Sequence, residues 1–449
     1  MLKIFRGEIL HFLGDPAKLP LAQSYQHIED GLLVVKDGLI EQVGEAALLL
    51  PTLLPTLPKD AQVTHYPNAL LTPGFVDTHI HYPQSEMIAS YGEQLLQWLE
   101  NYTYPAERQF SDPEKAADIA EFFLDQLLEA GTTTALVFGT VHKTSVDAFF
   151  NSAQKRKLRM ICGKVLMDQN CPDDLSDTAE TGFVDSKALI EQWHGKDRLQ
   201  YAVTPRFAPT CSRPQLDKAG ELLKLYPDVY MHTHLSESKQ EIEWVQELFP
   251  ESKNYLDVYD QSGLLGRRSI FAHGVHLSEH ECQRLSETDS NIAFCPTSNL
   301  FLGSGLFNLK QAEAHDINVG LGTDVGAGTS FSILRTLNEA YKTQQLRGEK
   351  LTPFKSFYLA TLGGAVALDL DDKIGNFEPG KEADFIVLDY KATPLMARRM
   401  AQCKSLAEKL FVLSMLGDER NVLATHIMGE AINNTNNTFN YNTNNTIND

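Results

Sequence analysis

The chain has 449 residues, of which 43% are hydrophobic and 22% charged, a mixture typical of globular proteins and sufficient for one large domain with additions. Its 39 basic and 59 acidic residues give a net charge of −20, which disfavours nucleic acid and membrane surfaces as partners, because both attract clustered cations. The sequence contains no signal-peptide or membrane-spanning pattern and no C-x-x-C pair among its six cysteines. We therefore expect a cytoplasmic protein with reduced thiols.

The N-terminal segment predicts strands rather than helices. Residues 32–44, around the Asp37-Gly38 turn, have the pattern of a β-hairpin. A similar pattern returns late in the chain, beginning at the Pro379-Gly380 turn. We expect residues 1–70 and 376–432 to form the two parts of one small β-sandwich domain.

Between residues 71 and 375, short β-branched runs alternate with amphipathic stretches, as in repeated βα units. Eight such strands predict an α/β fold of the (β/α)8 TIM-like barrel type, and no phosphate-binding glycine motif follows any of them. Residues 433–449, with nine Asn and four Thr, predict a disordered tail. The expected barrel strands are Gly74–His79, Thr132–Phe138, Met160–Leu166, Gln200–Arg206, Val229–His234, Ser269–His273, Asn291–Cys295 and Val319–Thr323.

Two histidines two residues apart end the first expected barrel strand. Side chains at i and i+2 of a strand share a face, so both rings can bind one metal ion, although such a pair also occurs by chance. Active sites of β/α barrels lie at the C-terminal strand ends, where further candidate ligands fall. Such a set of nitrogen and oxygen ligands suits zinc or iron. The residues are His79 and His81, His232 or His234, His273, and Asp324.

His232 and His234 share a strand face, so spacing alone does not choose between them. His234 lies nearer the C-terminal end of its strand and is better placed. Glu237 follows three residues later, where a carboxylate can move protons without binding the metal. Its alternative role is that of a solvated residue at a helix start. His276 is a weaker candidate ligand.

Six blocks of the sequence resemble the amidohydrolase superfamily, in the order in which that family has them. Within the superfamily they resemble the branch that deaminates guanine. The resemblance implies a barrel with a split β-sandwich, a homodimer, and one zinc ion held by His79, His81, His234 and Asp324. The blocks are Pro73–Gln84, Thr204–Thr210, His232–Glu237, Ala272–Gly274, Cys295–Leu300 and Gly320–Asp324.

The activity that the resemblance implies is hydrolysis of guanine to xanthine and ammonia by a water activated at zinc. Asp324 takes up the water proton, His273 aims the water, and Glu237 protonates the ring and then the leaving amino group. The fourth strand ends in residues 202–207 without a Lys or Glu that could bridge a second metal, so we expect one ion per subunit. The sequence does not distinguish zinc from iron.

Arg206, Gln84 and Phe207 are the expected base-binding residues, together with His234. Arg206 has only hydrogen-bond donors, so it can pair with the C6 carbonyl of guanine and not with the amino group of adenine; a structural salt bridge is its disfavoured alternative. Gln84 can donate and accept, and Phe207 can stack on the purine or pack in the core. Two other functions stay open: an amidohydrolase for a pterin, 8-oxoguanine or an S-adenosylhomocysteine-like nucleoside, and a noncatalytic scaffold that kept the fold.

Overall fold

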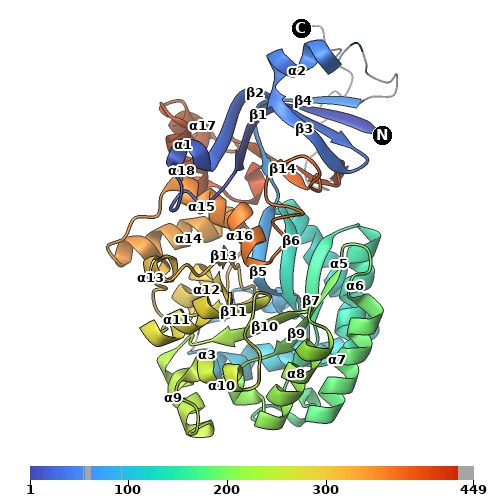
Figure 1. Cartoon of the computed structure of the whole chain (residues 1–449), viewed down its shortest axis with the longest axis vertical. Helices are drawn as coiled ribbons and strands as arrows, with labels where there is room; N and C mark the ends of the chain where they lie inside the picture. Colours follow the sequence, from blue (N-terminus) through green and yellow to red (C-terminus); the bar gives the residue numbers. More distant parts are fainter. Residues whose placement is uncertain (54, 56–61, 93, 433–449) are drawn as a thin grey trace.

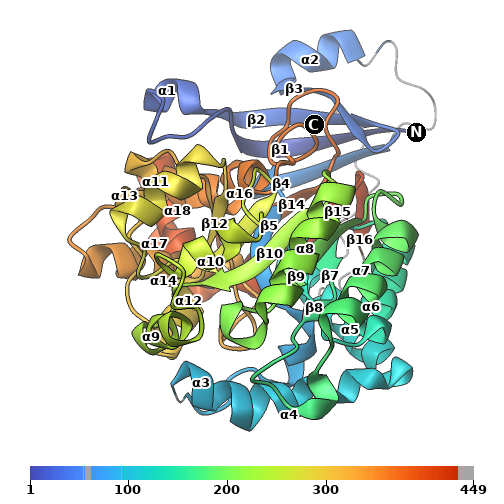
Figure 2. The same cartoon turned by 60° about the horizontal axis from the view of Figure 1, so that its bottom comes forward.

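A helix-covered barrel carries a separate β-sheet at one end (Figure 1). The computed structural model describes residues 1–53, 55, 62–92 and 94–432, so the tail expected at 433–449 lies outside the described residues. Two short helices, α3 (Leu95–Trp98) and α4 (Tyr104–Glu107), lie on the side of the barrel away from that sheet (Figure 2). None of the described helices is long and apolar enough to cross a membrane.

Strands from both ends of the chain pair in one seven-stranded sheet, in the order β16-β15-β14-β4-β1-β2-β3. The hairpin between β2 and β3 turns at Asp37 and Gly38, whose φ angles of 52° and 87° suit a two-residue hairpin turn. The small β domain is thus built from both chain ends, although β4 continues past residue 70. The strands are β1 (Leu2–Phe12), β2 (Tyr25–Lys36), β3 (Leu39–Glu45), β4 (Gln62–Pro73), β14 (Phe385–Asp389), β15 (Val422–Ile427) and β16 (Glu430–Ile432).

Eight parallel strands form the barrel, which confirms the predicted fold class, and all but the third end within two residues of the expected position. The third expected strand is interrupted at Lys164, and its second part, β8 (Val165–Leu166), pairs with β9. The backbone N–H of Asp324 donates to the carbonyl of His79 at 2.9 Å, which joins the last strand to the first. The barrel strands are β5 (Phe75–His81), β6 (Thr132–Phe138), β7 (Arg159–Gly163), β9 (Gln200–Pro205), β10 (Tyr230–Leu235), β11 (Ser269–His273), β12 (Asn291–Phe294) and β13 (Val319–Leu321).

Helices surround the barrel, and several begin at a capping side chain. Asp112, Ser238 and Ser278 each accept a hydrogen bond from a backbone N–H two or three residues further on, which stabilises the first turn. The remaining helices are α1 (Leu21–Ser24), α2 (Ala46–Leu53), α5 (Pro113–Glu129), α6 (Lys143–Lys155), α7 (Ala179–Trp193), α8 (Arg213–Leu225), α9 (Lys239–Leu248), α10 (Tyr255–Gln261), α11 (Glu279–Glu287), α12 (Pro296–Phe301), α13 (Leu309–Ala314), α14 (Ile333–Leu346), α15 (Pro353–Ala360), α16 (Leu362–Ala367), α17 (Pro394–Met400) and α18 (Leu406–Leu416).

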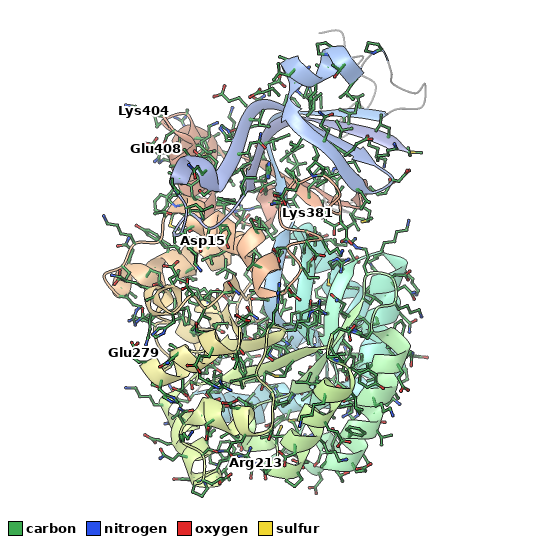
Figure 3. All side chains as sticks on the ribbon, in the orientation of Figure 1. Asp15, Arg213, Glu279, Lys381, Lys404 and Glu408 are labelled. Atoms are coloured by element: carbon green, nitrogen blue, oxygen red, sulfur yellow. The ribbon has the colours of Figure 1, made fainter. Side chains whose placement is uncertain are left out.

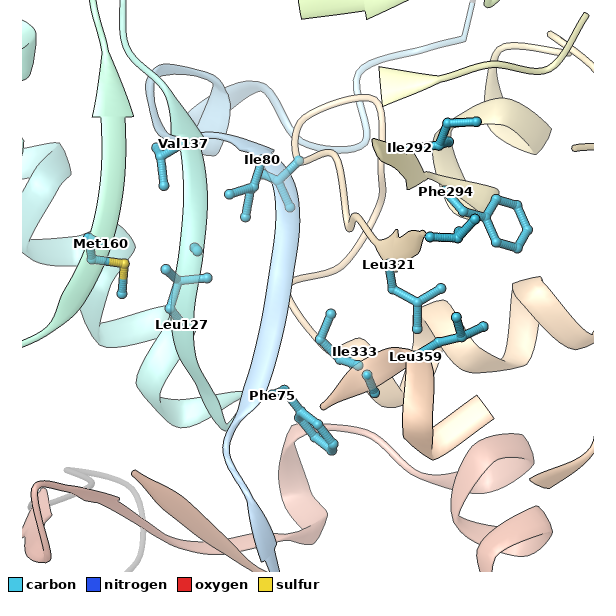
Figure 4. Packing of buried hydrophobic residues seen from close by; sticks show 14 of the residues in the cluster. Phe75, Ile80, Leu127, Val137, Met160, Ile292, Phe294, Leu321, Ile333 and Leu359 are labelled. Carbon is cyan, nitrogen blue, oxygen red and sulfur yellow. The ribbon is translucent and has the colours of Figure 1, made fainter. Parts of the chain in front are cut away.

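The largest hydrophobic cluster joins the barrel strands to the surrounding helices (Figure 4). Val137 of β6 packs in it with Leu127 of α5 and Met160 of β7. Leu136, the neighbour of Val137, belongs instead to a smaller cluster with residues from most of the other barrel strands. Successive side chains of β6 therefore pack on opposite faces of the strand, as expected in a barrel filled by side chains.

Two adjacent phenylalanines on α5 test how much this packing stabilises the fold. Phe123 is fully buried, whereas Phe122 is 47% exposed. We expect Phe123→Ala to lower the free energy of unfolding by about 3–5 kcal/mol, because it removes a buried ring and leaves a cavity. Phe122→Ala, the matched control, should change it by less than about 0.5 kcal/mol. Urea denaturation followed by circular dichroism measures both, and equal effects would show that the packing is misassigned.

Ion pairs connect the sheet domain to the barrel. Asp15, labelled in Figure 3 near the junction, accepts two hydrogen bonds of 2.8 Å from Nζ of Lys355 on α15. A second ion pair joins Arg198, just before barrel strand β9, to Glu382, just before β14 of the sheet: Nη2 of Arg198 lies 2.7 Å from Oε2 of Glu382. Because these side chains are largely buried, the contacts hold the two parts in a defined orientation.

Candidate metal centre

The four side chains expected to bind a metal meet at the C-terminal end of the barrel. The Nε2 atom of His79 lies 3.1 Å from Oδ1 of Asp324 and 3.2 Å from Nε2 of His81. The Nε2 atom of His81 in turn lies 3.3 Å from Oδ1 of Asp324 and 3.3 Å from Nε2 of His234. One ligand atom each of His79, His81 and His234 lie within 4.8 Å of one another, and atoms of His79, His273 and Asp324 form a second such group. Side chains from β5, β10, β11 and the segment after β13 therefore converge on one small volume.

Neutral histidine rings can direct the lone pair of one ring nitrogen at a metal ion. Nδ1 of His234 donates a hydrogen bond of 2.6 Å to the carbonyl oxygen of Arg206, so its Nε2 has no proton in the neutral ring. Burial lowers the pKa of His81 to about 3, so this ring is neutral at pH 7 as well. Lone pairs at such short separations repel one another unless a cation lies between them. The residues therefore fit a metal ion that prefers nitrogen and oxygen ligands.

Asp324 combines an unusual backbone with a strongly acidic side chain. Its φ angle is 52°, and that of His273 is 75°, both in the left-handed region, which costs a non-glycine residue about 1–3 kcal/mol. Burial opposes ionisation of Asp324, but the neighbouring His79, His81 and His273 rings together outweigh it and hold the pKa of the carboxyl well below its ordinary value. The Asp324 carboxyl is therefore anionic at neutral pH and lies on a segment with strained backbone.

Glu237 and His273 lie beside the ligand cluster. Nε2 of His273 is 3.5 Å from Oε2 of Glu237 and 3.7 Å from Oδ2 of Asp324, and its Nδ1 donates to Oδ1 of Asn299 at 2.8 Å. The hydroxyl of Ser304 donates to Oε1 of Glu237 at 2.9 Å. Burial, assisted by the charge of Asp324, raises the pKa of Glu237 to about 8. Glu237 can therefore hold a proton at neutral pH, as a general acid must.

A pocket lies against this cluster. Part of its wall is apolar and comes from α3 and the following turn, η3 (Leu99–Thr103), through Leu95, Trp98 and Leu99. All but one of the site residues expected from the sequence line this pocket. The exception is His79, which is fully buried. These lining residues are His81, Gln84, Arg206, Phe207, His234, Glu237, His273 and Asp324.

Arg206 forms a buried salt bridge, so disfavouring one on sequence grounds was wrong. Its Nη1 donates to both carboxylate oxygens of Glu107, at 3.0 and 2.8 Å. Glu107 is the last residue of α4 and is fully buried. The ion pair does not exclude a role in binding, because the guanidinium still lines the pocket and retains Nε and Nη2 as further donors.

The other two histidine candidates lie away from the ligand cluster's centre. Nε2 of His232 is 2.8 Å from Nδ1 of His79, so His232 contacts the back of that ring, while His234 faces the pocket. Nε2 of His276 donates to the carbonyl oxygen of Ser304 at 2.8 Å. Of these two histidines, His234, which lies nearer the strand end, is the one whose ring groups with those of His79 and His81.

Sequence reasoning missed four buried residues that support the site: Glu107, Glu241, Asn299 and Ser304. Glu241 accepts hydrogen bonds from the backbone N–H of Glu237 at 2.9 Å and of Ser238 at 3.1 Å. The Ser-x-x-Glu spacing of this capping box was a readable signal, and Asn299 lies within a block that resembles the superfamily. Glu107 and Ser304 carry no local signal, because their partners are distant in the chain.

Fold and site together define a metal-dependent hydrolase barrel. The sequence model of the amidohydrolase family matches residues 70–432. The chain belongs to the amidohydrolase family, which confirms the placement made from the sequence blocks.

Individual relatives extend the comparison along the whole chain. The chain is 54% identical to the guanine deaminase of Escherichia coli (strain K12), over 96% of this chain and 98% of that protein. It is 43% identical to a probable guanine deaminase of Deinococcus radiodurans, over 93% and 95% of the two chains. Among solved structures, E. coli guanine deaminase superposes with a TM-score of 0.91 at 52% identity, covering 96% and 99%. A guanine deaminase from C. acetobutylicum with guanine bound in the active site gives 0.85 at 30% identity, covering 96% and 100%.

Proposed function

We propose that this chain is a guanine deaminase, which hydrolyses guanine to xanthine and ammonia in purine catabolism or salvage. The observation that carries the proposal is the placement of Glu237 and Arg206 in one pocket beside the converging ligand atoms of His81, His234 and Asp324. The 54% identity to a guanine deaminase over almost the whole chain supports it. A noncatalytic scaffold would have no need to retain both the ligands and the buried acid.

We assign His79, His81, His234 and Asp324 as the ligands of one zinc ion per subunit. When bound there, zinc supplies a Lewis acid that lowers the pKa of water toward ~7. A His and Asp ligand set also suits iron, and elemental analysis of the purified protein distinguishes the two metals.

The catalytic residues divide the proton transfers among them. Oδ2 of Asp324 accepts a proton from the attacking water, and Nε2 of His273, 3.7 Å from that oxygen, hydrogen-bonds the water and aims it at C2 of guanine. Glu237 donates its proton to N3 of the ring and then passes the proton held by Asp324 to the amino group. It regains a proton from the added hydroxyl as the C2 carbonyl forms, so both carboxyl groups return to their starting states. The bond from C2 to the water oxygen forms, the bond from C2 to the amino nitrogen breaks, and ammonia leaves.

The pocket's polar wall selects the base. Arg206 donates to the C6 carbonyl of guanine and would face an amino donor in adenine, so a buried donor would then lose its partner. Gln84 and Phe207 also line the pocket, where Gln84 can hydrogen-bond the base and Phe207 can stack on it. His234, which also lines the pocket, contacts the base from the metal side.

We further propose that the protein works as a cytoplasmic homodimer without nucleic-acid or membrane partners. All six cysteines are free thiols, which suits a reducing compartment, and the net charge of −20 disfavours anionic partners. Light scattering of the purified protein should give the mass of two chains, and the mass of one chain would refute the dimer.

The proposed activity is tested by incubating the purified protein with guanine and measuring xanthine and ammonia together. We expect equimolar xanthine and ammonia at a rate proportional to protein concentration. If guanine is recovered unchanged by protein that contains its metal, the proposed function is wrong.

A further inference from the structure

Glu107 connects the two polar side chains that face the base. Its carboxylate accepts two hydrogen bonds from Nη1 of Arg206, at 3.0 and 2.8 Å, and one of 3.3 Å from Nε2 of Gln84. Arg206 and Gln84 line the pocket, whereas Glu107 lies behind them and is fully buried. Three segments far apart in the sequence are therefore joined directly behind the polar wall of the pocket: η2 (Tyr82–Met87), α4 and the end of β9.

The contacts of Gln84 fix which way its amide points. Its Oε1 accepts a hydrogen bond of 3.2 Å from the backbone N–H of Gly326, and its Nε2 donates to Glu107. A flipped amide would place its oxygen against the Glu107 carboxylate and its NH2 group against the N–H of Gly326, which are two unfavourable contacts. The amide oxygen is thus occupied, and the second hydrogen of Nε2 is the group left for a ligand.

The guanidinium of Arg206 is held in a similar way. A buried cation without a partner is strongly unfavourable, and the Glu107 carboxylate supplies the compensating charge and two acceptors at Nη1. Nε and Nη2 remain for a ligand, and both are donors only. Both side chains fixed by Glu107 therefore offer N–H groups to the base.

We propose that Glu107 is a positioning residue that sets base specificity by fixing Arg206 and Gln84 as a pair of donors. Such a pair selects a base with adjacent acceptors, such as the C6 oxygen and N7 of a 6-oxopurine, over a base with hydrogen or an amino group at C6. The choice of guanine as the physiological base rests on the proposed function. The donor pair itself is independent of catalysis and can be tested by binding alone.

The test uses two purines that carry no 2-amino group: hypoxanthine, which has the C6 oxygen, and unsubstituted purine, which lacks it. Calorimetry on the intact protein should show tighter binding of hypoxanthine. Glu107→Gln, which keeps the shape but removes the charge, should weaken hypoxanthine binding about 10- to 100-fold, as expected for hydrogen bonds to a charged group, and should leave purine binding within about twofold. Glu107→Asp, which retains the charge on a shorter side chain, should lose part of the preference.

Glu100→Gln is the matched control, because Glu100 is an exposed acid on the neighbouring turn η3, and this variant should bind both purines like the unchanged protein. A wild-type protein that binds the two purines equally would overturn the proposal. So would a Glu107→Gln variant that keeps its preference for hypoxanthine or loses both purines alike, since a purely structural role moves both together. If the preference behaves as expected and guanine is not deaminated, the proposed function fails and the donor pair stands.

Discussion

Glu237→Gln should lower the turnover of guanine by about 10²- to 10⁴-fold, the range usual for loss of a positioned acid or base, while the metal content is unchanged. Glutamine has almost the same shape and can still accept the 2.9 Å hydrogen bond from Ser304, but its amide cannot release a proton to the ring. The measurement is kcat for xanthine formation, with zinc per chain determined on the same preparation.

Glu243→Gln is the matched control for this variant, since Glu243 is an exposed acid on α9, six residues further along the chain. It should leave kcat and metal content unaltered. Full turnover by Glu237→Gln would remove Glu237 from the proton-transfer role and leave the fold and the ligand cluster as described.

His81→Ala should abolish guanine turnover together with metal binding. The Nε2 atom of His81 lies 3.3 Å from Asp324 and from His234, so its removal takes away the ligand between them. With three protein ligands left in an otherwise unchanged barrel, we expect zinc per chain to fall from about one to well below one after dialysis against a chelator, as ligand loss reduces affinity. Elemental analysis measures this directly.

His280→Ala is the matched control, because His280 is an exposed histidine on α11 that does not belong to the ligand cluster. It should retain zinc and turnover through the same dialysis. A His81→Ala protein that keeps a full equivalent of metal would place the metal elsewhere in the molecule.

The barrel and the convergence of side chains at its C-terminal end were predictable because they depend on local pattern. Each barrel strand is a short apolar run between turn signals, and strand ends in a parallel barrel meet at one face, so His79, His81, His234, His273 and Asp324 could be brought together without coordinates. The hairpin at Asp37-Gly38 followed from turn chemistry in the same way.

The polar wall of the pocket was less predictable, because it depends on contacts between distant segments. Arg206 could be placed at a strand end, but its partner Glu107 lies 99 residues earlier, in a short helix outside the repeating βα pattern. The orientation of Gln84 likewise depends on a backbone N–H at Gly326, 242 residues away. No spacing rule connects such positions, so the sequence suggested what these side chains can bind but not how they are held.

Guanine deamination by this protein is tested most sharply by ammonia release from a panel of bases, with metal content assayed on the same sample. The panel is guanine, adenine, cytosine, 8-oxoguanine and a pterin. We expect about one zinc per chain and a kcat/KM for guanine far above that for the other bases, by up to ~10⁴-fold over adenine. Preference for another base, or full guanine turnover by metal-free protein, would contradict it.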